Sequence, residues 1–131
     1  MRNLLKTGLR TGLVGAGIAA ATFGLASPAL AADLSVNVGD GTIRYDDSAD
    51  SFCAQAYNTE GQRIVEVKLV PVGQSGPSPT WQDRNSSYGH PGATCRSLAT
   101  AYEDTRYRAD VRTYWAERGT WVNRGSFYFY S

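Results

Sequence analysis

Hydrophobic and polar residues alternate with a period of two along most of the chain after residue 32. In residues 63–70, for example, Val65, Val67 and Leu69 share one face, whereas charged residues occupy the other. Runs of this kind predict strands at residues 34–38, 42–46, 52–57, 63–70, 95–100, 106–115 and 121–130. Turn-forming residues separate most of them at intervals of roughly 8–12 residues, as is typical of sandwiches. The sequence therefore predicts an all-β antiparallel sandwich of about seven strands.

The alternation is lost between residues 71 and 92, where Gly, Ser, Pro and Asn dominate. We expect one long loop here, and a loop of this length in a small domain is commonly functional. Trp81, Tyr88 and His90 lie in it and are candidate binding residues. A shorter connection, residues 58–61, predicts a hairpin loop between two adjacent strands.

The N-terminus has the pattern of a secretory signal. Arg2, Lys6 and Arg10 are followed by a segment without charge, and small residues precede Ala31. The alternative is a buried or membrane helix, but the apolar stretch is short for a membrane span. We therefore expect a signal peptide at residues 1–31 and a single secreted, extracellular domain at residues 32–131, with no membrane span after signal removal.

Charge and composition narrow the function of that domain. Ten basic and twelve acidic residues follow residue 31, so the net charge there is −2. Binding to nucleic acid driven by electrostatics is not expected, because it needs a basic excess. Fourteen of the fifteen aromatic residues lie in the same part of the chain, and this content indicates a folded domain.

Cys53 and Cys95 are the two cysteines of the chain, and an oxidising exterior favours a disulfide between them. One alternative is a metal site, but such a site needs more soft ligands than two cysteines and one histidine. The other is a redox pair, but redox cysteines usually have two residues between them. The alternate residues Phe52, Ala54 and Ala56 form the more apolar set. That set would turn Cys53 outward, but the pattern does not decide which face Cys53 occupies.

The segment beginning at Thr105 resembles the tyrosine corner of immunoglobulin-like and fibronectin type III sandwiches. Thr105, Tyr107 and Val111 match a Thr-x-Tyr-x-Val-x-Val run, with Ala109 in place of the first Val. The resemblance implies a small immunoglobulin-like sandwich in which the Tyr107 hydroxyl bonds to upstream backbone. Because Ala109 stands where antibody domains have their second cysteine, the bridge would join different strands, the second and the fifth.

Catalytic chemistry has weak support in the sequence. His90 is the one histidine, and Ser75 lacks the Gly-x-Ser-x-Gly setting of a nucleophile. Glu66, Arg108 and Arg112 with His90 resemble the residue types of small secreted ribonucleases, so a hydrolase of that kind is the alternative function. We assign no catalytic residue.

The acidic segment at residues 46–51 contains oxygen ligands of the kind that Ca²⁺ prefers. It lacks the Gly and Glu positions of an EF-hand loop. It resembles the Asp-Asp-x-x-Ser-Ser pattern of a βγ-crystallin calcium site but departs from it at one residue, Asp50. We expect a solvated turn here, and neither a metal nor another cofactor.

The last two predicted strands favour binding. Continued alternation would place Arg124 and five candidate binding residues on one exposed sheet face beside Glu66 and Lys68: Arg108, Arg112, Tyr114, Tyr128 and Tyr130. Arg and Tyr offer contact area and hydrogen bonds at low entropic cost. The sequence therefore predicts a non-catalytic binding protein whose ligand is either an unknown protein or a cell-wall component or carbohydrate. The alternative is that this face is an ordinary solvated sheet face.

Short strings near the C-terminus are similar to lactococcin-type bacteriocins. They comprise residues 80–82, 87–90 and the closing Ser-Phe-Tyr-Phe-Tyr at 126–130. The similarity implies a small secreted β-sandwich with antibacterial activity, which is a third possible function. The long loop and the sheet face compete as the site.

Overall fold

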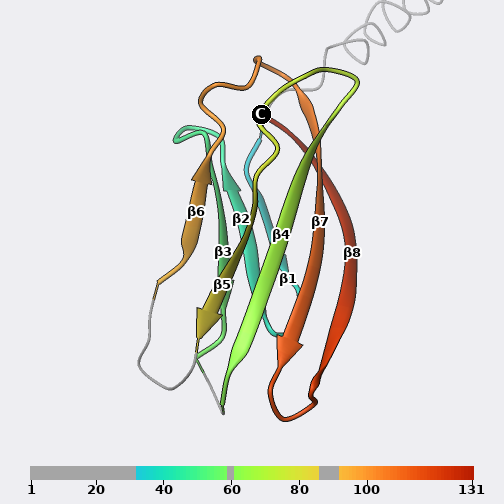
Figure 1. Cartoon of the computed structure of the whole chain (residues 1–131). Coiled ribbons are helices and arrows are strands. Elements are labelled where there is room, and N and C mark those ends of the chain that lie inside the picture. Colours follow the sequence, from blue (N-terminus) through green and yellow to red (C-terminus); the bar gives the residue numbers. More distant parts are fainter. Residues whose placement is uncertain (1–31, 59–60, 86–91) are drawn as a thin grey trace, which may run out of the picture.

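Two antiparallel four-stranded sheets form the molecule in a computed structural model, which describes residues 32–58, 61–85 and 92–131 (Figure 1). The first sheet has the order β1-β2-β3-β6 and the second the order β5-β4-β7-β8. The all-β prediction is confirmed, with one more strand than expected. No helix in the described ranges is long and apolar enough to cross a membrane. The strands are β1 Leu34–Asn37, β2 Gly41–Asp46, β3 Ser51–Ala56, β4 Arg63–Val72, β5 Thr80–Asn85, β6 Thr94–Ser97, β7 Arg106–Trp115 and β8 Thr120–Tyr130.

The core lies between the two sheets and is rich in aromatic rings. Phe52 of β3 meets Trp81 edge-on, with ring centroids 5.9 Å apart, and lies 5.1 Å from Phe129 of β8. The predicted alternation in β4 is confirmed, because Val65, Val67 and Leu69 are fully buried. Burying such side chains is the main favourable contribution to folding.

Strand β5 corrects the prediction of one long loop over residues 71–92. Trp81 lies on this strand, is 4% exposed, and donates from Nε1 to the Thr94 carbonyl at 2.8 Å. It is a core residue and not a candidate for ligand contact. Hydrophobicity did not reveal the strand because its next inward residue is Asp83, which accepts from the Ala56 amide and the Thr94 hydroxyl at 2.7 Å each.

The predicted hairpin at residues 58–61 is wrong. Strand β3 pairs with β2 and β6, whereas β4 pairs with β5 and β7, so the chain changes sheets between them. Residues 59 and 60 lie outside the described ranges. A short polar connection is compatible with either arrangement, because the face that each strand buries decides its partner.

The predicted disulfide is present and joins directly opposed residues of β3 and β6 (Cα–Cα 4.0 Å). These are the third and sixth strands in chain order, and not the second and fifth as expected; both belong to the first sheet. Cys53 alternates with the core residues Phe52 and Ala54, so it lies on the outer face of the first sheet. The bridge therefore staples an edge strand to its neighbour.

Tyr107 is the tyrosine of the segment that resembles a tyrosine corner, and it is fully buried near the start of β7. Its hydroxyl donates to the Pro77 carbonyl at 2.8 Å and so ties the β4–β5 connection to the core. A Cβ atom at Gly76 would lie 2.7 Å from this hydroxyl oxygen, so the close approach requires glycine. The bond thus holds the connection between β4 and β5 against the end of the sandwich.

A buried ionic cluster joins the two sheets near their opposite end. Asp40, in the turn between β1 and β2, is 2% exposed and pairs with Arg63 at 3.0 Å and with Arg124 at 2.8 Å. The Thr113 hydroxyl also donates to Asp40, at 2.7 Å. Burial raises the pKa of Asp40, but the hydrogen bonds from Thr113 and Arg124 and the two arginine charges outweigh it, so the pKa is lowered.

The inward position of Arg124 contradicts the prediction that it faces solvent. In the β7–β8 pair Val111 is opposite Gly125 but Arg112 is opposite Asn123, so Arg124 is an extra residue in β8. This bulge reverses the alternation and turns Arg124 towards Asp40. Gly39 leaves room for it, because a Cβ there would lie 2.9 Å from the guanidinium.

Candidate binding face

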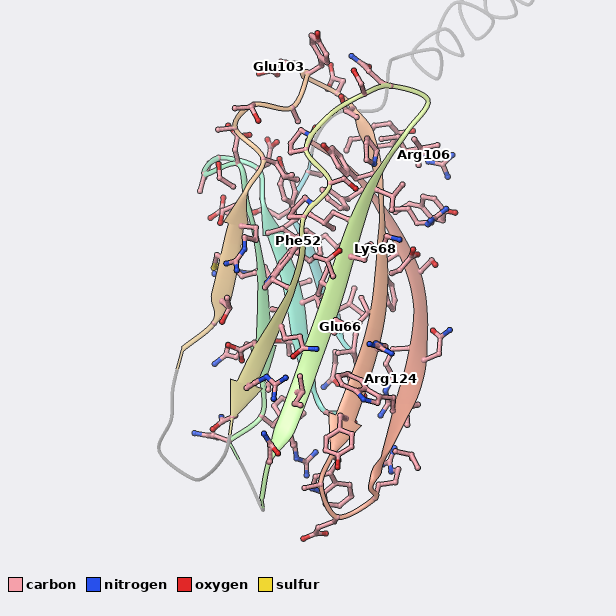
Figure 2. All side chains as sticks on the ribbon, viewed as in Figure 1. Phe52, Glu66, Lys68, Glu103, Arg106 and Arg124 are labelled. Carbon is pink, nitrogen blue, oxygen red and sulfur yellow. A yellow bond between two sulfur atoms is a disulfide. The ribbon has the colours of Figure 1, made fainter. Side chains whose placement is uncertain are left out.

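Side chains from all four strands of the second sheet form its outer face, which we call the binding face. The register places the five residues predicted for the last two strands together there: Arg108, Arg112, Tyr114, Tyr128 and Tyr130. Glu66 and Lys68 of β4 lie beside them, as expected (Figure 2). Gln82 and Arg84 of β5, Arg106 and Asp110 of β7, and Trp121, Asn123 and Ser126 of β8 complete it.

Trp121 and Asn123 were missed in the sequence. The bulge at Arg124 shifts the alternation by one residue, so odd-numbered residues before it face the same way as even-numbered residues after it. Trp121 is 38% exposed and Tyr128 is 49% exposed. The sequence carries one signal of the bulge, which is a glycine, Gly125, inside a predicted strand. Gly125 follows Arg124 and has a positive φ of 99°, as glycines at bulges often do.

A row of hydrogen bonds crosses three strands of this face at Glu66. Gln82 of β5 donates to Glu66 at 2.7 Å, and Arg112 of β7 donates to both oxygens of the same carboxylate. The hydrogen bond from Arg112 is the main reason that the pKa of Glu66 is lowered. Glu66 is therefore ionised at neutral pH and fixes the guanidinium of Arg112.

Asp110, two residues before Arg112 on β7, holds a second group of side chains. It accepts from the Ser126 hydroxyl at 2.6 Å and from two nitrogens of Arg108, at 2.9 and 3.1 Å. Burial raises the pKa of Asp110, but these hydrogen bonds and the charge of Arg108 outweigh it and lower the pKa. Lys68 is opposite Asp110 in the register but forms no ion pair with any described residue.

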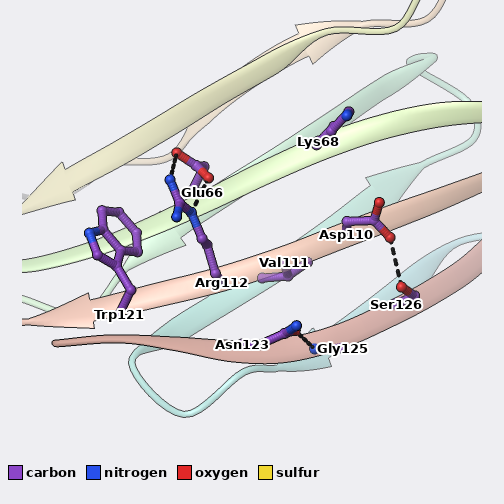
Figure 3. A pocket seen from close by; sticks show the side chains of 9 residues that line it. All are labelled: Glu66, Lys68, Asp110, Val111, Arg112, Trp121, Asn123, Gly125 and Ser126. Atoms are coloured by element: carbon purple, nitrogen blue, oxygen red, sulfur yellow. Dashed lines mark hydrogen bonds and ion pairs between the residues drawn. The ribbon is translucent and has the colours of Figure 1, made fainter.

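A shallow pocket of about 500 Å³ lies between the two groups (Figure 3). Its lining includes Glu66 and Asp110 as hydrogen-bond acceptors and Lys68 and Arg112 as donors. Trp121 stands at one end of it. The pocket therefore offers donors, acceptors and an aromatic surface within one concave area, as ligand sites commonly do.

Two arginine–aromatic stacks stand on the binding face. The Arg112 guanidinium lies 4.3 Å from the ring centroid of Trp121, and that of Arg106 lies 4.3 Å from the ring centroid of Tyr128. Cation–π contacts of this kind contribute about 0.5–1 kcal/mol at exposed sites. They hold both rings in defined positions while leaving much of each exposed.

The remaining predicted site residues are Trp81, Tyr88 and His90. Trp81 is in the core, and Tyr88 and His90 lie outside the described residues. Of the ribonuclease-like set, Glu66, Arg108 and Arg112 share the binding face. In the acidic turn, Asp46 accepts from the Ser48 hydroxyl at 2.7 Å and the Ala49 amide at 3.2 Å. Within the described ranges no three His, Cys, Asp or Glu side chains are grouped to hold a metal.

Comparison of the chain with protein-family models, curated proteins and solved structures found no match. The function is therefore inferred from the side chains of the binding face.

Proposed function

We propose that the protein is a secreted, non-catalytic binding protein that contacts its partner through the binding face. The observation that carries this proposal is the pair of exposed aromatic rings, Trp121 and Tyr128, each with an arginine stacked on it. Trp, Tyr and Arg are the residues that most often dominate binding energy at interfaces. The intramolecular disulfide is compatible with an oxidising exterior.

The ion pairs of this face support binding more than they support stability. Arg112 is 50% exposed in its pair with Glu66, and Arg108 is 38% exposed in its pair with Asp110. Pairs this exposed contribute about 0–1 kcal/mol to folding. Their main effect is to fix the arginines in one conformation, which lowers the entropy lost when a partner binds.

The same pairs favour binding over hydrolysis. A general base should have a pKa near the working pH, so that it can take up a proton. Glu66 and Asp110 have lowered pKa values and already accept hydrogen bonds from arginine. Both carboxylates are therefore poor proton acceptors at neutral pH, which supports the non-catalytic reading over a ribonuclease-type hydrolase.

Alanine substitutions on the binding face test this proposal. We expect Trp121→Ala, Tyr128→Ala and Arg112→Ala to weaken binding by about 1–3 kcal/mol at one or two of the three positions. Each should change the free energy of unfolding by no more than about 0.5 kcal/mol, because the side chains are exposed. The measurement is saturable binding of the labelled, exported protein to cells and surface material of the organism that makes it.

Ser35→Ala and Gln55→Ala are the matched controls, because both side chains are exposed on the outer face of the first sheet. They should leave the affinity unchanged. Unchanged affinity in all three binding-face variants, or an equal loss in the controls, contradicts the assignment of the surface.

A further inference from the structure

We propose that the ligand of the binding face is a linear polysaccharide that carries carboxylate groups. This inference rests on the proposed function and names the chemical class of its partner. It is carried by three features of the face: its charge, its mixture of donors and acceptors, and the spacing of its aromatic rings.

The binding face is basic although the domain is not. It carries five basic residues and two acidic ones, whereas residues 32–131 together have ten and twelve. Three of its cations, Lys68, Arg84 and Arg106, form no ion pair with any described residue. On the first sheet, a shallow depression lies beside Cys53, and Arg44 is the one charged residue among the described residues that line it. Charge complementarity therefore favours an anionic ligand on the binding face.

The pocket favours a sugar over a phosphate backbone. A sugar hydroxyl both donates and accepts hydrogen bonds, so it can contact the carboxylates of Glu66 and Asp110 as well as the cations Lys68 and Arg112. The phosphate groups of a nucleic acid backbone are acceptors only and carry a high density of negative charge, so the two central carboxylates would repel them. An acidic glycan satisfies both sets of groups, since its hydroxyls reach the pocket and its carboxylates reach the unpaired cations.

The two stacks point to an extended ligand. In the register Trp121 is opposite Tyr114 and Tyr128 is opposite Arg108. The two positions are six residues apart on β7, which corresponds to roughly 20 Å along the strand. The pocket lies between them, so a linear chain that follows β7 and β8 meets both rings and the pocket at once. The apolar faces of sugar rings suit exposed aromatic rings.

The test uses polygalacturonate as the acidic glycan and its methyl ester as the matched neutral chain. Isothermal titration of the exported protein should show binding to polygalacturonate that weakens with salt, and binding to the ester that is at least about tenfold weaker. The double variant Lys68→Gln/Arg106→Gln should lose about tenfold in affinity for polygalacturonate and little for the ester. Arg44→Gln, on the opposite face, should bind both chains as the wild type does.

Three results would overturn the inference. Tighter binding to single-stranded polyadenylate than to polygalacturonate would assign the face to nucleic acid. Absence of binding to polygalacturonate, together with saturable cell binding that Trp121→Ala weakens, would reject the acidic glycan and leave the proposed function standing. If Trp121→Ala, Tyr128→Ala and Arg112→Ala also leave cell binding unchanged, both the ligand class and the binding face are wrong.

Discussion

Asp40→Ala is expected to lower the free energy of unfolding by about 3–5 kcal/mol, the usual cost of removing one partner from a buried ionic cluster. Asp40 is 2% exposed and pairs with both Arg63 and Arg124. Its removal leaves two arginines partly buried without their counter-ion and deprives the Thr113 hydroxyl of its acceptor. Urea unfolding measures the change. Glu117→Ala, at an exposed acid in the β7–β8 turn, is the control and should change stability by no more than about 0.5 kcal/mol.

The Asp40 cluster also predicts a pH dependence. Because the folded-state pKa of Asp40 is lowered, its carboxylate contributes stability above its unfolded-state pKa of 3.8, and that contribution is lost as the pH falls through the lower folded-state value. The difference in stability between the wild type and Asp40→Asn should therefore be largest near neutral pH and shrink below about pH 4. A difference that stays constant between neutral and acidic pH would contradict the pairing.

Removal of the disulfide should have an effect of similar size. The bridge joins residues 42 positions apart, and the chain-entropy model assigns such a loop roughly 4 kcal/mol. We expect Cys53→Ser/Cys95→Ser to lose about that much in free energy of unfolding, measured in guanidinium chloride. The wild type in reducing agent should behave in the same way. A midpoint equal to that of the oxidised wild type would show that the bridge does not contribute to stability.

The sequence predicted those strands in which hydrophobicity reports burial directly. Strand β7 was predicted with the same bounds as observed, and its inward residues Tyr107, Ala109 and Val111 are buried. The placement of Arg108, Arg112 and Tyr114 on the opposite face follows from the same alternation. The resemblance to immunoglobulin-like sandwiches stays a prediction.

The remaining parts were missed because polar side chains occupy inward positions. Strand β5 turns Asp83 towards the core, where the Ala56 amide and Thr94 hydroxyl satisfy it. Hydropathy cannot show such a position, because the compensating hydrogen bonds come from distant parts of the chain. Arg124 is a second case, since its partner Asp40 lies 84 residues away. The bulge that turns it inward also brings Trp121 to the binding face.

The most direct test of whether the partner is contacted through the binding face is to block each outer face of the sandwich in turn and to measure binding. Lys68→Cys places a thiol within the pocket of the binding face, and Ser35→Cys places one on the outer face of the first sheet. Each variant is coupled to a polyethylene glycol maleimide, and its saturable binding to cells of the producing organism is compared with that of the uncoupled variant. We predict that coupling at position 68 abolishes binding and that coupling at position 35 leaves it unchanged. If binding survives coupling at position 68, or if only coupling at position 35 abolishes it, the binding face is not the contact surface.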